Sequence, residues 1–157
     1  MSGSAGDGGG RPVVDVSLVE GVPAEGAGDP LDSLRQQAAG WLGDHAAPHG
    51  VVWNPSDFAL RATRDGALTG TLIGSINIRW LHIGMLAIRP TERRSGVGGA
   101  LLAKAEELAR ERDCVGIWLD TFDFQAPDYY PRFGYVEYGR IADMPPGHTR
   151  LFFAKRL

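Results

Sequence analysis

The sequence predicts a mixed α/β domain in which helices pack on a single sheet. Three observations lead to this class: strand-like segments outnumber helical ones early in the chain, a strand–helix–strand unit lies at its centre, and two further strands close it. With 157 residues, 43% of them hydrophobic and 22% charged, the chain has the size and composition of one globular domain. We expect that domain over residues 13–157, preceded by a disordered tail rich in glycine and serine over residues 1–12.

The elements before residue 79 follow from side-chain periodicity and turn signals. β-Branched residues with partial alternation favour strands, and apolar residues at helical spacing favour a helix, which Asp29 or Asp32 can cap. The turn signal Arg64-Asp65-Gly66 joins two strands. The predicted elements are a strand at 13–20, a helix at 31–47 and two strands at 57–66 and 67–78.

The elements after residue 79 contain the strand–helix–strand unit. Its first strand ends at Arg89-Pro90, because proline cannot donate a hydrogen bond to a strand ladder. From Gly96 the pattern turns helical, and Glu106 with Arg110 forms an i,i+4 pair that supports the helix. The predicted elements are a strand at 80–88, a helix at 96–112, a strand at 114–121, a short helix at 125–133, and strands at 134–141 and 148–157.

Charge and composition exclude several classes of protein. The net charge of -3 argues against a nucleic-acid binder that works by charge alone, and it leaves room for a cationic small-molecule substrate. No stretch reaches the ~18 apolar residues of a membrane helix, and the N-terminus lacks the features of a signal peptide. We therefore expect a cytoplasmic protein that binds neither nucleic acid nor a membrane. The lone Cys114 has no activating neighbours in sequence and is expected to be a buried packing residue.

Arginines and glycines gather in the stretch RPTERRSGVGGALL, residues 89–102, between a predicted strand and a predicted helix. The first-turn amides of a helix are unpaired and its dipole favours anions, while glycine lets a bulky anion approach the backbone. Arg93 and Arg94 add charge-assisted donors. The stretch therefore fits a diphosphate, although a tight turn with solvated arginines is the alternative. A P-loop lysine and the third glycine of a dinucleotide fingerprint are both missing, since Ala100-Leu101 follows the last glycine.

The segment Arg93-Arg94-Ser95-Gly96-Val97-Gly98 resembles the R/Q-x-x-G-x-G/A motif of the GNAT superfamily of acyl-CoA-dependent N-acetyltransferases. Residues 85–112 look like the family's fourth strand, pyrophosphate loop and following helix, and residues 117–139 look like its fifth strand, next helix and YxxxGY/F ending. Residues 145–157 are similar to the last strand of small bacterial members. This resemblance, good over residues 68–157, implies the GNAT fold: a mixed, mostly antiparallel central sheet with helices on both faces.

The resemblance also implies that acetyl-CoA is the co-substrate and that no metal is needed. A V-shaped opening between the family's strands four and five would take the pantetheine arm, which would pair with the backbone as an added strand does. One amide there, held by a strand bulge in the family, would polarise the thioester carbonyl. The residues expected to bind acetyl-CoA are Leu86, Ala87, Ile88, Arg93, Arg94, Ser95, Gly96, Val97, Gly98, Gly99 and Gln125.

Acetyl transfer in the family implies direct attack by the amine within a ternary complex, without a covalent acyl-enzyme. Tyr130 is similar in place to the family's general acid, and Tyr129 beside it is expected to be a packing residue. Asp120 matches an acidic residue that is the base in some members, and it can equally be a surface or capping carboxylate. Many relatives carry glutamate where this chain has Gly84, so His82 is kept as a reserve base.

The favoured function is N-acetylation of a primary amine on a small molecule. Protein N-terminal or lysine acetylation is the alternative within the class, and a non-catalytic acyl-CoA-binding module, kept open by the missing strand-four carboxylate, is the alternative from another class. The acceptor itself stays open, and so does a homodimer. The residues expected to line the acceptor site are Trp80, His82 and Asp123, with Trp53, Phe124 and His148 as further candidates.

Overall fold

The structure is a computed structural model that describes residues 14–21 and 29–157. It divides into a unit that ends at His45 and a unit of Ala46–Leu157. The expected tail over residues 1–12 lies outside the described residues. Within the described part of the chain, no helix is both long enough and apolar enough to cross a membrane.

The unit that ends at His45 contains helix α1, Pro30–Ala46, within one residue of the predicted range. The backbone N–H of Leu31 donates to Asp29 Oδ1 at 2.9 Å, so Asp29 is the capping residue of the two aspartates considered. The predicted strand at 13–20 is wrong, because residues 14–20 have no regular secondary structure. A strand persists only when a neighbour pairs with its backbone, and no described residue pairs with this segment.

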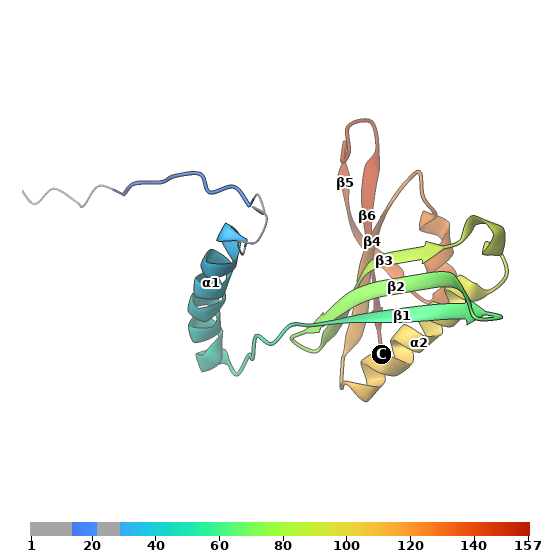
Figure 1. Cartoon of the computed structure of the whole chain (residues 1–157), viewed down its shortest axis with the longest axis horizontal. Helices are drawn as coiled ribbons and strands as arrows, with labels where there is room; N and C mark the ends of the chain where they lie inside the picture. Colours follow the sequence, from blue (N-terminus) through green and yellow to red (C-terminus); the bar gives the residue numbers. More distant parts are fainter. Residues whose placement is uncertain (1–13, 22–28) are drawn as a thin grey trace, which may run out of the picture. The chain divides into compact units, whose positions relative to one another are not determined.

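The unit of Ala46–Leu157 is built on a sheet of six described strands in the order β1-β2-β3-β4-β6-β5 (Figure 1). Neighbouring strands run antiparallel except β3 and β4, which are parallel. This arrangement confirms the predicted mixed, mostly antiparallel sheet. The strands are β1 Ser56–Arg64, β2 Ala67–Asn77, β3 Trp80–Ile88, β4 Gly116–Phe122, β5 Val136–Ala142 and β6 Thr149–Arg156.

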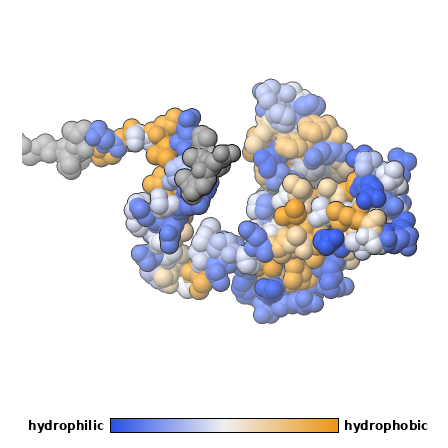
Figure 2. Space-filling view, viewed as in Figure 1, coloured by the Kyte–Doolittle hydropathy of each residue, from blue (hydrophilic) through white to orange (hydrophobic). Residues whose placement is uncertain are grey.

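Helix α2, Val97–Glu111, connects the two parallel strands and packs along one face of the sheet, against β1–β4 (Figure 1). The core lies between them, because apolar residues alternate along the central strands and one stripe of the helix is apolar. The largest fully buried side chains are Leu72, Leu81, Leu102, Ile117 and Leu119. Apolar side chains also reach the surface of this unit (Figure 2), and Leu68, Ile73 and Met85 are exposed by 43–55%.

Short 3₁₀ helices complete the unit. They are η1 Ala47–His49, η2 Pro90–Glu92 and η3 Pro127–Phe133. The predicted short helix at 125–133 is therefore a 3₁₀ helix, with Pro131 inside it. A proline has no N–H to give to an α-helical ladder, which favours the short 3₁₀ form here. Cys114 is buried, and burial raises the pKa of its thiol, as a packing role requires.

Candidate active site

The parallel strands β3 and β4 separate part-way along their length. They pair over four residues only, ending at Ile83 opposite Leu119. Beyond that point β3 stays paired with β2 as far as Ile88, and β4 stays paired with β6 as far as Phe122. The separation begins at a β-bulge in which Gly84 is the extra residue of β3. The bulge therefore opens the sheet between its two central strands, and one backbone edge of β3 has no strand partner among the described residues.

The loop after β3 presents the first turn of α2 beside that opening. Gly96 caps the helix in the left-handed region with φ 86°. The first bond into the helix is from the Ala100 N–H to the Gly96 carbonyl at 3.0 Å, so the N–H groups of residues 96–99 have no backbone acceptor among the described residues. Arg93 and Arg94 are exposed on the same loop. Free donors, a helix dipole and two guanidinium groups together suit a polyanion such as a diphosphate.

The Cβ positions of Gly98 and Gly99 face η3. A Cβ built on Gly98 would collide with the Tyr129 hydroxyl, and one on Gly99 would lie 3.1 Å from the Phe133 ring. Gly96 differs, because its Cβ position is open while its φ favours glycine. The glycines of the motif therefore have separate roles: one allows a left-handed turn, and two allow η3 to pack on the first turn of α2.

The two neighbouring tyrosines of η3 face different parts of the protein. Tyr129 covers the first turn of α2 as described, whereas the Tyr130 ring lies 6.1 Å from that of Tyr135 and 5.9 Å from that of Phe153. Burial raises the pKa of both phenols, and the charges of Tyr129 and Asp120 raise the pKa of Tyr130 further. Both hydroxyls therefore stay protonated at neutral pH, and each retains a proton that it can donate.

Asp120, near the end of β4, is held by an arginine. Its Oδ2 accepts a hydrogen bond from Arg150 Nε at 2.7 Å, and its side chain is 16% exposed. The same guanidinium lies 5.5 Å above the Phe122 ring and 5.6 Å above the Phe152 ring. The guanidinium thus already occupies one oxygen of the carboxylate. The ion pair therefore competes with a role of Asp120 as the base.

His82 lies beside the bulge, on the sheet face that α2 does not cover. Its ring stacks on that of Trp118 with centroids 3.8 Å apart, and a Cβ built on Gly84 would lie 3.6 Å from His82 Cε1 and 3.9 Å from Nδ1. Its Nε2 is buried without a partner in the described structure. Burial lowers the pKa of His82, Asp120 opposes this shift, and Arg150 adds to it. The imidazole is therefore neutral at neutral pH and has a lone pair that can accept a proton.

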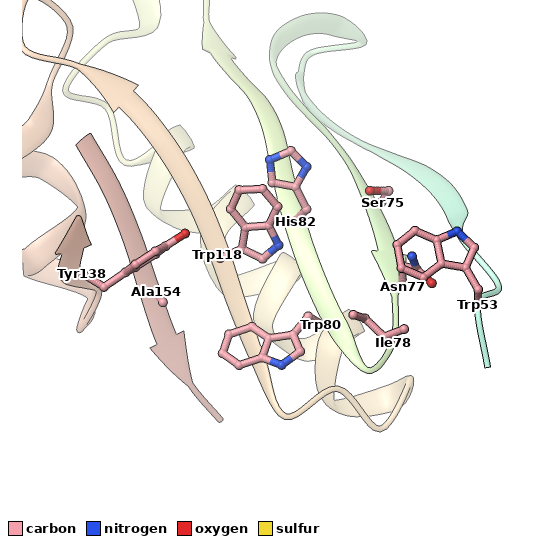
Figure 3. Close-up of a pocket in the computed structure, with 9 residues that line it drawn as sticks. All are labelled: Trp53, Ser75, Asn77, Ile78, Trp80, His82, Trp118, Tyr138 and Ala154. Carbon is pink, nitrogen blue, oxygen red and sulfur yellow. The ribbon is translucent and has the colours of Figure 1, made fainter. Parts of the chain in front are cut away.

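A pocket of about 580 Å³ opens beside His82 on this face (Figure 3). Aromatic rings make most of its wall, and Ser75 and Asn77 are the other polar residues in it. Among the described residues, no carboxylate lines it. Its lining residues are Trp53, Ser75, Asn77, Ile78, Trp80, His82, Trp118, Tyr138 and Ala154.

The loop after β4 contains two predicted site residues that lie outside this pocket. Gln125 Oε1 accepts from Thr121 Oγ1 at 2.8 Å, which holds the loop against β4. Asp123 is 3.0 Å from His148 Nδ1 and accepts the Thr149 N–H at 2.9 Å, so it joins this loop to β6. The carboxylate of Asp123 and the amide oxygen of Gln125 are thus engaged within the protein.

The pocket brings together some of the expected acceptor residues and adds others. Three of the residues expected at the acceptor site line this pocket, namely Trp53, Trp80 and His82, whereas Asp123, Phe124 and His148 do not. The pocket also contains residues that were not expected from the sequence, among them Trp118, Tyr138, Ser75 and Asn77. Strand alternation offered one signal, because Trp118 lies two residues before Asp120 and residues two apart share a face. Tyr138 had no local signal, since it reaches the pocket from β5.

Comparison with known proteins agrees with this geometry. A model of the acetyltransferase (GNAT) family matches residues 29–135. A blasticidin-S acetyltransferase of Streptomyces morookaense is 42% identical over 93 residues, which are 59% of this chain and 68% of that protein. An acetyltransferase structure from Bacillus cereus matches with a TM-score of 0.72 at 30% identity, covering 90% of this chain and 98% of that chain.

An acetyltransferase structure from Bacillus anthracis, solved in complex with acetyl coenzyme A, shares the fold at a TM-score of 0.60 and 20% identity, covering 69% of this chain and 67% of that chain. The family match spans more than half of the chain, and the separated strands and glycine loop lie where the motif resemblance requires them. This chain belongs to the acetyltransferase (GNAT) family, is an acyltransferase, and uses acetyl-CoA as its co-substrate.

Proposed function

We propose that this enzyme transfers the acetyl group of acetyl-CoA to a primary amine of a small molecule, by direct attack within a ternary complex. The observation that carries the proposal is the pocket of about 580 Å³ beside His82, which lies next to Ile83, the last residue of β3 that pairs with β4. Its volume lies within the range of small-molecule sites, and aromatic walls with a few polar groups are typical of them. The blasticidin-S acetyltransferase relative supports a small-molecule acceptor over a protein.

The residues for acetyl-CoA follow from the opening and the loop. The unpaired backbone edge of β3, at Leu86, Ala87 and Ile88, would hydrogen-bond the pantetheine amides as a neighbouring strand would. The free N–H groups of residues 96–99, with Arg93 and Arg94, would hold the diphosphate. The Ser95 hydroxyl donates to the Glu92 carbonyl at 2.6 Å and so holds the loop itself, which leaves backbone and arginine donors for the anion.

His82 is the residue we propose as the general base. The attacking nitrogen must be neutral, and the proton it loses on forming the C–N bond needs an acceptor. His82 is neutral, lines the acceptor pocket, and turns its Cε1–Nδ1 edge toward the bulge at Gly84. Gly84 leaves open the place where many relatives carry glutamate, and the imidazole fills the adjoining space. The nearby charge of Asp120 favours the imidazolium that forms, while Arg150 opposes it.

Tyr130 is the residue we propose as the general acid. When the C–S bond breaks, the thiolate of coenzyme A takes a proton, and a phenol whose pKa is raised by burial still holds one. The charge of Asp120 on β4 adds to the rise that burial causes in the pKa of Tyr130, which supports a position of this phenol near β4. Tyr129 lies against Gly98 and would contact the coenzyme A side of the site instead.

Release of the coenzyme A thiol in the presence of an amine panel tests the proposed function. The panel contains small primary amines, free amino acids, and peptides with a free N-terminus or a lysine. We expect acetylation of a small amine and little of any peptide, with the product identified by mass. Faster acetylation of a peptide would instead support a protein acetyltransferase. Binding of acetyl-CoA without thiol release from any acceptor would support the non-catalytic module.

A further inference from the structure

The pocket beside His82 is enclosed by aromatic rings from separate parts of the chain. Trp53 precedes β1, Trp80 lies on β3, Trp118 on β4 and Tyr138 on β5. Figure 3 shows Trp53 on the β2 side of the pocket, with Trp118 and Tyr138 on the opposite side. Folding does not account for all four rings, because Trp53 and Tyr138 remain 46% and 60% exposed. Exposed apolar side chains that gather in one place are typical of a binding site. Flat faces of this kind stack on flat ligands.

The charges around the pocket oppose a ligand that carries several ammonium groups. The Arg156 guanidinium lies 4.9 Å above the Trp80 ring. Arg150 and Asp120 are paired with each other at 2.7 Å, so that carboxylate has its counter-charge already. No carboxylate among the described residues lines the pocket. Several ammonium groups that are taken out of water together need counter-charges, and among the described lining residues a polyamine or an aminoglycoside would find no carboxylate to supply one.

The polar groups of the pocket suit the edge of a ring. Ser75 and Asn77 lie on β2, on the same side of the pocket as Trp53 (Figure 3). The Asn77 side-chain oxygen already accepts the Asn54 N–H at 3.2 Å, which leaves its NH₂ group free to donate. The Ser75 hydroxyl can donate or accept. These two groups can therefore bond carbonyl or ring-nitrogen atoms in the plane of a ligand that stacks on the tryptophans.

We infer that the acceptor is a primary amine attached to a flat, uncharged aromatic or heteroaromatic ring, which the aromatic walls bind by stacking while the amine reaches His82. This inference rests on the proposed function, because it takes the pocket as the acceptor site. It names a substrate class that follows from the walls and charges of this pocket. Saturated amines of equal size and polycationic amines are excluded as good acceptors for two different physical reasons, shape and charge.

Matched amines test the inference. 2-Phenylethylamine and 2-cyclohexylethylamine have the same carbon skeleton and similar basicity, and they differ in whether the ring is flat. We expect kcat/KM for the aryl amine to exceed that for the cyclohexyl amine about tenfold, mostly through KM, because stacking acts on binding. Spermidine and an aminoglycoside should be poorer still. Equal kcat/KM for the two rings, or a preference for either polycation, would overturn the inference while leaving acetyl transfer to small amines intact.

Variants at Trp53 show whether the pocket is the source of this preference. Trp53 lies outside the strands, so its replacement should leave the sheet folded, which circular dichroism checks. Trp53→Leu should reduce the ratio of aryl to cyclohexyl kcat/KM at least threefold, whereas Trp53→Phe should keep that ratio because a flat ring remains. An unchanged preference in Trp53→Leu would contradict the inference.

Binding gives a second readout that does not depend on turnover. With coenzyme A present, the aryl amine should quench tryptophan fluorescence at lower concentration than the cyclohexyl amine, and Trp53→Leu should reduce the difference between the two concentrations. If no amine is acetylated but this difference is present, the proposed function fails and ring recognition stands. If neither ring quenches at millimolar concentration, ring recognition fails.

Discussion

At the residue scale, the base assignment depends on three neighbours at the separation of β3 and β4. Gly84 has an ordinary backbone conformation and room for a Cβ, His82 stacks beside it, and Asp120 is paired with Arg150. Arg150 already occupies one oxygen of the Asp120 carboxylate, while the neutral imidazole of His82 has a lone pair that can accept a proton. We therefore propose His82 ahead of Asp120 as the base, the reverse of the order expected from the sequence.

Replacing His82 tests this assignment. His82→Asn should lower kcat/KM by about 10²–10⁴-fold, the usual contribution of a general base, with little change in acetyl-CoA affinity. Adding Gly84→Glu to that variant should restore part of the rate, since a Cβ at position 84 would lie only 3.6 Å from the present position of His82 Cε1. Initial rates of thiol release measure both. If Asp120→Asn is more damaging than His82→Asn, with folding intact, Asp120 is the base.

The pH profile gives the same test an independent readout. Burial lowers the pKa of His82 below its ordinary 6.5, so the base form is complete at neutral pH and is lost only as the pH falls below 6.5. We expect the acidic limb of kcat below pH 6.5 in the wild type. In the double variant the limb should move, because a glutamate titrates in its place.

The neighbouring residues Tyr129 and Tyr130 give a second prediction at this scale. Tyr130→Phe should lower kcat by about 10²–10⁴-fold and keep the KM for acetyl-CoA, because the ring still packs while the donated proton is gone. Tyr129→Phe is the matched control: it removes the hydroxyl at Gly98 and should leave kcat nearly unchanged. Steady-state kinetics with a fixed acceptor measure both changes. The opposite ranking would move the general acid to Tyr129.

At the scale of elements, the packing of η3 on α2 shapes the coenzyme A loop. The N–H groups of residues 96–99 are available to a ligand only if the first turn of α2 stays in place, and η3 covers that turn from one side. Gly98 is the contact point, because any side chain larger than that of glycine at position 98 would collide with the Tyr129 hydroxyl. Gly96 controls the same turn through its backbone angle of φ 86°.

A double-mutant cycle separates these two effects. Gly98→Ala should destabilise the fold by ~1–3 kcal/mol, because its methyl group meets the Tyr129 hydroxyl, and Tyr129→Phe should recover part of that loss. Gly96→Ala should cost ~1 kcal/mol through its left-handed backbone, with no recovery from Tyr129→Phe. Thermal or urea unfolding measures both. Additive effects of Gly98→Ala and Tyr129→Phe would show that the two residues do not press on each other.

At the scale of the whole molecule, ligand binding links the site to the stability of the fold. Acetyl-CoA binds the folded chain only, so at 100 times its Kd it should add ~2.7 kcal/mol to the free energy of unfolding and raise Tm by several degrees. Arg93→Ala should reduce this rise, more at low salt than at high salt, because the arginine acts by charge. Differential scanning fluorimetry measures the rise in Tm for the wild type and the variant. A folded protein whose Tm does not respond to millimolar acetyl-CoA would contradict the proposed loop contacts.

Local sequence patterns by themselves determined the helix and the strands that surround the site. Strands β1–β6 and helix α2 lie within about two residues of their predicted ranges, since periodicity and turn signals depend on neighbours along the chain. The motif at residues 93–98 indicates an anion-binding loop for the same reason, and that loop stays a prediction. The strand expected at 13–20 failed because strand structure requires a pairing partner, which a local pattern cannot supply. One domain over 13–157 stays a prediction.

Only the tertiary structure decided which side chains meet at the site. The strand order β4-β6-β5 places Arg150 beside Asp120, thirty positions apart in the chain, and brings Tyr138 to the pocket of His82 and Trp118. The packing of η3 on α2 placed the Tyr129 hydroxyl against Gly98. These contacts arise from long-range pairing and desolvation. Both depend on how distant segments are brought together, and so neither is encoded in the spacing of residues along any one element.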